Sequence, residues 1–347
     1  MQLFSNDLGI DLGTSNILIY AENQGVVVRE PSVVAVDKNT GKILQVGTAA
    51  KNMLGRTPGN VVAMHPLRDG VISDHEMTVK MLQLLFKSVG TSKFFAPKPR
   101  VIVCVPSGVT EVEERTVINA VVESGARRVY LIEEPLAAAL GANMDLRGPN
   151  GHMVVDIGGG TTDIAVLTMN DVAVSSSIKI AGVAFDDAIA RYVRRKFGVI
   201  IGQNTAEDVK IRIGSVFPRP EDMSMTVRGR DAKNGTPQEV ELYASEVYQV
   251  LSRMAKQIAD EVSSVLEDTS PELVADIATN GITLTGGASQ IWGMDLLLSE
   301  RTGIPCTVAD DPESCVAYGC GKSLSWINHM NEGPINIARK RILKGRQ

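Results

Sequence analysis

The sequence predicts an α/β protein made of two related halves. Its 347 residues are about twice the length of a typical single domain. The chain has 32 glycines but only seven Phe, six Tyr and two Trp, which favours buried strands of small aliphatic residues joined by tight turns. One strand–turn–strand pattern also occurs twice, around Asp11 and around Asp156, so we expect a duplicated unit with a cleft between its copies.

Composition and charge exclude several classes of protein. The chain is 44% hydrophobic and 22% charged, which excludes a disordered chain, and its net charge of −5 gives no overall basic field for nucleic acid. No apolar run reaches the roughly 18 residues of a membrane span, and the N-terminus lacks the pattern of a secretion signal. The four cysteines and four histidines show no metal-ligand spacing. We therefore expect a cytoplasmic protein with reduced thiols.

The first half of the sequence is expected to form several strands, followed by alternating helices and strands. Apolar residues at helical spacing, such as Met77, Met81 and Leu85, predict a helix over 77–89. Residues 101–105 are all apolar, as in a buried strand, and acidic residues in the first turn favour a helix over 111–124. The other expected elements are strands at 8–10, 17–20, 26–29, 32–36, 43–46 and 129–132 and an alanine-rich helix at 134–140.

The second half repeats this order. It begins with three expected strands and continues with helices, and a polar loop over 229–238 is expected to join two strands of a hairpin. The expected strands are 154–157, 162–168, 172–180, 223–227, 239–242, 282–285 and 307–309, and the expected helices are 186–197, 206–213, 245–266, 294–302 and 315–327.

The repeated motif has the chemistry of a phosphate site. In each copy an apolar strand ends in Asp-x-Gly and hydroxyl residues, at 11–15 and at 156–162. A glycine turn lets backbone N–H groups converge on an anion, and a carboxylate at the strand end suits a divalent cation held through water. Two such hairpins that face each other would clamp a polyphosphate. The alternative is a plain glycine hairpin in which Asp and Thr only form the turn.

Two further glycine patterns are less specific. Gly286 and Gly287 follow an apolar strand, where the bare backbone could admit a flat base or a phosphate. Gly319 and Gly321 lie inside a helical pattern, where each costs about 1 kcal/mol relative to Ala, so we expect close packing of this helix against another element. The dinucleotide fingerprint and the Walker A lysine are absent from the sequence.

Taken together, the motifs resemble a known superfamily. In order and content they are similar to the five-motif signature of the actin, Hsp70 and sugar-kinase superfamily, and over about residues 5–325 the chain resembles bacterial actins of the MreB/Mbl family. The five matching segments are 10–16, 132–139, 156–163, 284–287 and 318–321. Further family-like stretches are 30–35, 55–60, 66–72 and 228–231.

The resemblance implies a duplicated actin-like ATPase fold of the ribonuclease-H-like type, with two lobes around a nucleotide cleft. Lobe I would comprise residues 1–149 and 311–347, with a small subdomain at about 32–76. Lobe II would comprise residues 150–310, with a small subdomain at about 182–244.

The resemblance also implies the site for ATP or ADP with Mg²⁺. Glu134 would orient the attacking water with help from Thr161, and Asp11 and Asp156 would hold Mg²⁺ through water. The phosphates would be held by Thr14, Ser15, Asn16, Gly158, Gly159, Gly160 and Thr161. The ribose and base would be contacted by Glu207, Lys210, Gly286, Gly287, Ala288, Ser289 and Gln290. Without the resemblance, Glu207 and Lys210 are a surface ion pair.

The chain departs from the family pattern at two places near the nucleotide. The usual Glu-Arg before the nucleotide helix is Gln203-Asn204, and the third glycine of the adenosine turn is Ala288. These changes bear on affinity for the base or selectivity among bases, whereas the residues implied in hydrolysis are intact.

The implied function is that of a filament-forming bacterial actin with a slow ATPase coupled to polymerisation. It would organise cell-wall synthesis and maintain rod shape at the inner face of the cytoplasmic membrane, with cell-wall elongation and membrane-linker proteins as partners. Three alternatives remain open. They are a chaperone-type ATPase, which the short remaining tail disfavours, a small-molecule kinase with Asp69 or Asp74 as base, and a nucleotide-locked scaffold without turnover.

One loop suggests contact with a membrane surface. Phe94 and Phe95 are adjacent and lie among Lys93, Lys98 and Arg100, a pattern that suits insertion into an anionic headgroup layer, as the resemblance also implies. Alternatively, both rings are tucked into the body of the protein. The basic stretch 333–347 is either a solvated tail or a second contact with lipid.

The membrane hypothesis predicts that replacing Phe94 and Phe95 with Ser lowers co-sedimentation with anionic liposomes, because the apolar anchor is removed. Unchanged co-sedimentation of the double variant would refute it.

Overall fold

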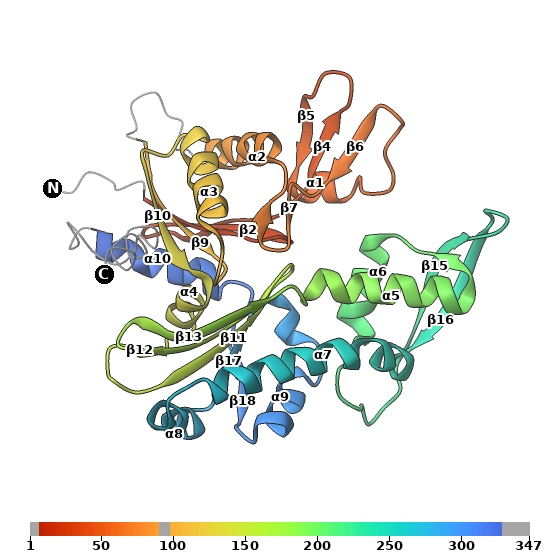
Figure 1. Ribbon diagram of the computed structural model, residues 1–347. Coiled ribbons are helices and arrows are strands. Elements are labelled where there is room, and N and C mark those ends of the chain that lie inside the picture. Colours follow the sequence, from red (N-terminus) through yellow and green to blue (C-terminus); the bar gives the residue numbers. More distant parts are fainter. Residues whose placement is uncertain (1–6, 90–97, 328–347) are drawn as a thin grey trace.

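The computed structural model describes residues 7–89 and 98–327, which form two lobes that are each organised around a five-stranded sheet (Figure 1). The first sheet has the order β10-β9-β1-β2-β3 and the second the order β13-β12-β11-β17-β18. The strands of the first are β1 Leu8–Leu12, β2 Asn16–Ala21, β3 Gly25–Pro31, β9 Arg100–Val105 and β10 Arg128–Glu133. Those of the second are β11 His152–Ile157, β12 Thr162–Thr168, β13 Asp171–Ile178, β17 Ile282–Thr285 and β18 Cys306–Val308.

The two sheets have the same topology. In each, three consecutive strands form an antiparallel meander, and two later strands add in parallel beside the first strand of the meander. Asp11 and Asp156 hold equivalent places, one residue before the end of β1 and of β11. The duplication predicted from the repeated motif is therefore confirmed.

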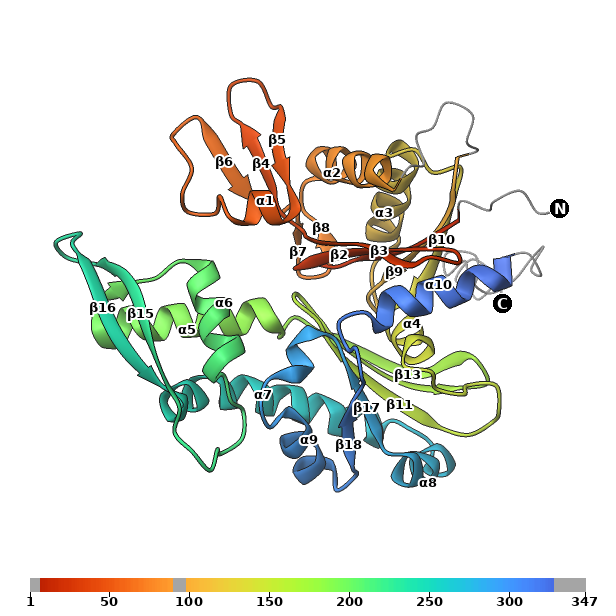
Figure 2. The same cartoon turned by 180° about the vertical axis from the view of Figure 1, so that it is seen from behind.

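Helices cover both faces of each sheet. The helices α4 Glu134–Gly141 and α10 Cys315–Ile327 lie between the sheets, because α4 contacts strands of both and α10 packs on α4 and β1 (Figure 2). On the outer faces lie α2 His75–Ser88 and α3 Glu111–Glu123 for the first sheet, and α7 Ala244–Glu267, α8 Pro271–Asn280 and α9 Met294–Thr302 for the second. Residues of both sheets therefore share one buried cluster with α4 and α10.

Glycines allow α10 to approach its neighbours at backbone distance. A methyl group on Gly319 would overlap the carbonyl oxygen of Ala137 on α4, and one on Gly141 would overlap the carbonyl oxygen of Cys315. Gly321 is packed in the same way against the ring of Tyr20 on β2. The close packing expected from glycines within a helical pattern is present.

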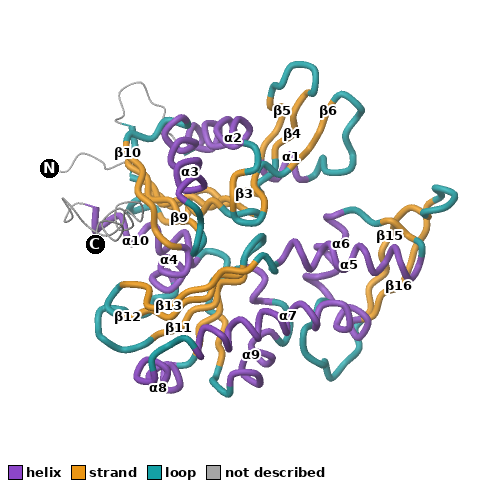
Figure 3. Tube along the Cα trace, in the orientation of Figure 1, coloured by secondary structure: helices purple, strands orange, loops and turns teal. Residues whose placement is uncertain are grey.

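Each lobe carries a smaller sheet at one end (Figure 3). In the first lobe it consists of β4 Val34–Asp37, β5 Ile43–Val46 and β6 Val61–Met64 with the short helix α1 Gly47–Lys51, and the two-stranded β7 Leu67–Arg68 and β8 Val71–Ile72 follow. In the second lobe it consists of β14 Val199–Ile200, β15 Ser224–Asp231 and β16 Pro237–Tyr243, together with α5 Gly182–Phe197 and α6 Gln203–Ile213.

Some expected boundaries were wrong. The polar stretch 229–238 continues both hairpin strands, because β15 and β16 pair as far as Arg230 and Pro237, which leaves only a short turn. Helix α5 begins at Gly182, four residues before the expected start, and α8 was not predicted. Phe94, Phe95 and the stretch 333–347 lie outside the described residues. Within the part of the chain that the structure describes, no helix is long and apolar enough to span a membrane.

The packing of α10 predicts that Gly319→Ala destabilises the protein by about 1–3 kcal/mol or more, since a methyl group must displace the α4 backbone. Thermal or urea unfolding measures this loss. Gly59→Ala is the matched control, because nothing lies within 4 Å of the added carbon, and it should change stability by less than about 0.5 kcal/mol. Equal stability of the two variants would contradict this packing.

Candidate nucleotide-binding site

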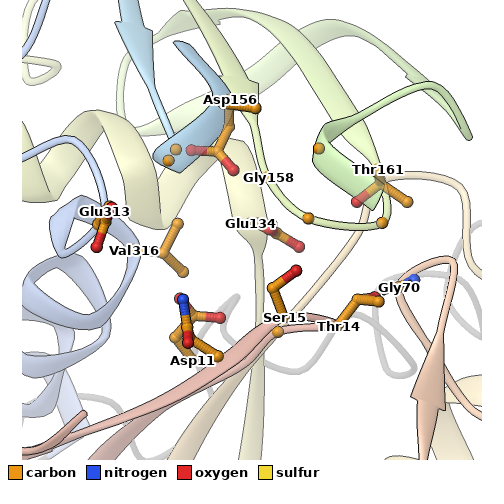
Figure 4. Close-up of a pocket in the computed structure, with 18 of the residues that line it drawn as sticks. Asp11, Thr14, Ser15, Gly70, Glu134, Asp156, Gly158, Thr161, Glu313 and Val316 are labelled. Carbon is orange, nitrogen blue, oxygen red and sulfur yellow. Dashed lines mark hydrogen bonds between the residues drawn. The ribbon is translucent and has the colours of Figure 1, made fainter. Parts of the chain in front are cut away.

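The two Asp-x-Gly hairpins face each other across one pocket between the lobes (Figure 4). Asp11 and Asp156 lie on opposite sides of it, with Glu134 between them. Most of the residues implied by the sequence line this pocket, namely Asp11, Gly13, Thr14, Ser15, Asn16, Glu134, Asp156, Gly158, Gly159, Gly160, Thr161, Glu207, Lys210, Gly286, Gly287 and Ala288. Residues from positions 11 to 288 are thus brought to one cavity by the fold.

The loop of the first lobe is held in place by hydrogen bonds from two residues elsewhere in that lobe. Ser32 Oγ donates to the carbonyl oxygen of Gly13 at 2.6 Å, and the backbone N–H of Gly70 donates to Thr14 Oγ1 at 2.9 Å. Gly70 has φ +77°, a conformation that side chains rarely adopt, and a methyl group there would lie 2.9 Å from Thr161 Cγ2. Gly70 therefore joins the pocket by backbone geometry, which the sequence did not reveal.

The loop of the second lobe is a tight turn that touches the first loop. The N–H of Gly158 donates to the carbonyl oxygen of Thr161 at 3.0 Å. Methyl groups on Gly159 and Gly160 would overlap the hydroxyl oxygens of Ser15 and Thr14. Glycine is required at both positions for this approach, and the two loops are close enough to contact the same small anion.

Four carboxylates lie buried or half-buried at or beside the pocket. Burial, with repulsion from Asp156, raises the pKa of Asp11 to about 7, and burial raises the pKa of Asp156 to about 6. Asp163 on β12 is fully buried, accepts a hydrogen bond from the N–H of Ser107 at 2.9 Å and has a pKa raised to about 7 by burial. Burial and then repulsion from Asp163 raise the pKa of Glu134. Concentrated negative charge of this kind favours a bound cation.

Glu207 and Lys210 on α6 line the pocket but bond to other groups rather than to each other. The Lys51 ammonium in the first lobe lies 2.6 Å from Glu207 Oε2, so this ion pair crosses between the lobes. Lys210 Nζ lies 2.9 Å from Asp186 Oδ1 and donates to the carbonyl oxygen of Gly182 at 3.1 Å. Burial raises the pKa of Asp186 to about 6, although Lys210 opposes the shift.

Two implied residues do not line the pocket. The Ser289 hydroxyl donates to the carbonyl oxygen of Gly286 at 2.7 Å and supports the turn, while Gln290 is exposed and reaches Glu313. Conversely, the pocket is also lined by residues that were not among the implied site residues, namely Leu12, Leu18, Gly70, Cys104, Pro106, Gly182, Ile211, Pro312, Glu313 and Val316. These residues come from separate elements, and only the tertiary packing brings them to the same pocket.

Comparisons with known proteins agree with this geometry. The family model "MreB/Mbl protein" matches residues 5–332. The chain is 48% identical to cell shape-determining protein MreB of Escherichia coli K12, over 94% of this chain and 95% of that protein. It is 47% identical to cell shape-determining protein Mbl of Bacillus subtilis 168, over 93% of this chain and 96% of that protein.

Solved structures show the same relationship. MreB5 of Spiroplasma citri bound to ADP superposes with a TM-score of 0.88 at 40% identity, covering 94% of this chain and 98% of that one. A MamK double helical filament, at 22% identity and a TM-score of 0.77 over 92% of this chain and 98% of that one, shares the fold. The actin-like fold expected from the motifs is confirmed, and the chain belongs to the MreB/Mbl family.

Proposed function

We propose that this chain binds ATP or ADP in the pocket between its lobes and assembles into filaments that determine cell shape. The observation that carries the proposal is the pair of Asp-x-Gly hairpins that meet across one pocket. Support comes also from relatives that were solved with ADP and with AMPPNP. In this proposal ATP draws the lobes together and favours contacts between subunits, and hydrolysis weakens those contacts.

The phosphates are proposed to lie between the two touching loops. Thr14, Ser15 and Asn16 offer hydroxyl and amide groups from the first lobe, and the backbone of 158–161 offers N–H groups from the second. Glu207 and Lys210 contact the ribose and base edge, and the turn at 286–288 backs the adenosine. Because Glu207 also pairs with Lys51, a bound ribose would share this carboxylate with the contact between the lobes.

Mg²⁺ is proposed to bind near Asp11 and Asp156. Within the described ranges no three His, Cys, Asp or Glu side chains form a cage for a metal ion. These two carboxylates, whose pKa values burial raises, fit an ion that keeps several waters and is otherwise held by phosphates. When bound, the ion would neutralise charge on the phosphates.

Hydrolysis is proposed to depend on the first residue of α4. Glu134 lies in the pocket between the two hairpins, where its carboxylate can accept a proton or hydrogen bond from a water that approaches the terminal phosphate. The Thr161 hydroxyl, on the second loop, assists in holding that water. Such catalysis requires positioning and charge stabilisation rather than a covalent intermediate.

Partners and location follow from the same proposal. The chain would assemble with further copies of itself at the inner face of the cytoplasmic membrane, together with cell-wall elongation and membrane-linker proteins. Family membership and the aromatic pair at 94–95 support this assignment.

The proposal predicts assembly that depends on nucleotide. Pelleting and light scattering with ATP, with ADP and without nucleotide should show filaments that ATP favours, with slow phosphate release measured in parallel. Gly160→Val, which fills the contact between the loops, should abolish both signals, whereas Gly59→Ala should retain them. Turnover that requires an added sugar, without assembly, would instead identify a small-molecule kinase.

The assigned role of Glu134 predicts that Glu134→Ala keeps nucleotide affinity but slows phosphate release by about 10²-fold or more, because the water loses its acceptor. Single-turnover phosphate release measures the effect. Glu133→Ala is the matched control: the neighbouring carboxylate lies outside the pocket, 3.3 Å from Ser107 Oγ, and its loss should leave the rate near that of the wild type. A normal rate in Glu134→Ala would refute the assignment.

A further inference from the structure

The same hydrogen-bonding arrangement occurs once in each lobe, beside the carboxylate near the end of the first strand. In each five-stranded sheet a parallel strand runs next to that first strand, β9 beside β1 and β17 beside β11. Thr285 on β17 pairs in register with Asp156, and Cys104 on β9 stands at the corresponding place beside Asp11. The duplication therefore places a side chain with one polar proton beside each carboxylate, and the proposed function assigns neither side chain a role.

The hydroxyl of Thr285 holds the carboxylate of Asp156. Thr285 Oγ1 donates to Asp156 Oδ1 at 2.5 Å, and neither residue is more than 2% exposed. The other carboxylate oxygen, Oδ2, is turned towards the phosphate loop, where it lies 3.9 Å from the position of a methyl group on Gly158. The second side-chain torsion of an Asp has only a broad energy minimum, so a hydrogen bond from another residue is needed to fix the plane of the carboxylate. Thr285 supplies that bond.

The thiol of Cys104 stands in the same relation to Asp11 but makes a weaker bond. Cys104 lines the pocket, and its Sγ lies 3.6 Å from Asp11 Oδ1, within hydrogen-bonding range for sulfur. The neighbouring thiol of Cys320 on α10 has an acceptor of its own, because it donates to the carbonyl oxygen of Ile10 at 3.7 Å. The single proton of Cys104 is therefore available to Asp11, although a thiol is a poorer donor than a hydroxyl.

Hydrogen bonds to a carboxylate stabilise its charged form and fix the direction in which it meets a metal ion or the waters around that ion. We propose that Thr285 and Cys104 are positioning residues for Mg²⁺, which hold Asp156 and Asp11 in the orientation that contacts the water shell of the ion. The short Thr285 bond keeps Asp156 rigid, whereas the long thiol bond lets Asp11 adjust as the ion and the phosphates enter. This inference rests on the proposed binding of a nucleotide with Mg²⁺ in the cleft.

The test measures how much Mg²⁺ strengthens the binding of ADP to the full chain. Titration calorimetry with Mg²⁺ and with EDTA gives two affinities, and their ratio is the gain from the metal. Thr285→Val keeps the shape of the side chain but removes its hydroxyl, so the gain should fall by about tenfold or more. Thr285→Ser retains the hydroxyl and should keep the gain within about threefold of the wild type. A variant that only loosens the fold lowers both affinities and leaves their ratio unchanged.

Cys104→Ala and Cys104→Ser make the same test in the first lobe. Because the thiol is the weaker donor, Cys104→Ala should lower the gain by about threefold to tenfold, and Cys104→Ser, which places a hydroxyl beside Asp11, should restore it. Thr283→Val is the matched control, since Thr283 lies two residues before Thr285 on β17 and does not line the pocket. Its gain should equal that of the wild type.

A wild-type gain in Thr285→Val or in Cys104→Ala would overturn the inference for that residue. So would an equal loss of affinity with and without Mg²⁺, or a loss that the serine variant does not restore, because the side chain would then only support the fold. Thermal unfolding without ligand checks that each variant is folded, and the Cys104 variants decide the question if Thr285→Val is not.

The wild type separates this inference from the proposal on which it rests. If it binds no ADP under either condition, the proposed function itself fails. If it binds ADP and Mg²⁺ adds nothing, the proposed metal site fails and this inference fails with it. If Mg²⁺ strengthens binding equally in the wild type and all variants, the nucleotide site stands and only the assignment of Thr285 and Cys104 is wrong.

Discussion

The close packing of α10 on α4 is the contact on which the rest of the structure depends. Gly319 and Gly141 let the two helix backbones touch, and both helices lie between the sheets of the two lobes. Because the sheets share this layer, the ends of β1 and β11 are held at the same cleft. The pocket therefore depends on helix packing, in which Gly319 of α10 lies directly against the backbone of Ala137 on α4.

Electrostatics determine what the cleft can accept. Asp11, Asp156, Asp163 and Glu134 lie close together. Burial raises the pKa of each of them, and repulsion from neighbouring carboxylates adds to the shift at Asp11, Asp163 and Glu134. Isolated, such a cluster is unfavourable, since each charge has lost water without gaining a cation. The glycine loops beside it offer N–H groups to an anion. A cation and a polyphosphate together satisfy both features, which is the physical basis of the proposed Mg²⁺–nucleotide site.

Contacts between the lobes connect the site to the shape of the molecule. The Lys51–Glu207 ion pair and the hydrogen bond from Ser107 to Asp163 both join one lobe to the other beside the pocket. A ligand that engages Glu207 or the 158–161 loop acts on these contacts directly. In the proposed function, a change at the phosphates would act through these contacts on the angle between the lobes.

The sequence by itself determined the duplicated α/β architecture and the two hairpins of the phosphate site. These features are local, because an apolar strand, an Asp, a glycine turn and a hydroxyl residue follow one another along the chain. Their chemistry can therefore be predicted from the order of the residues. Only the tertiary structure decided which distant groups meet. Arg29 and Glu313 are 284 positions apart, and the partners of Glu207 and Lys210 lie on other elements. The spacing of apolar and polar residues along the chain does not predict such pairs. Side-chain partners across a cleft depend on how whole helices and sheets pack against each other.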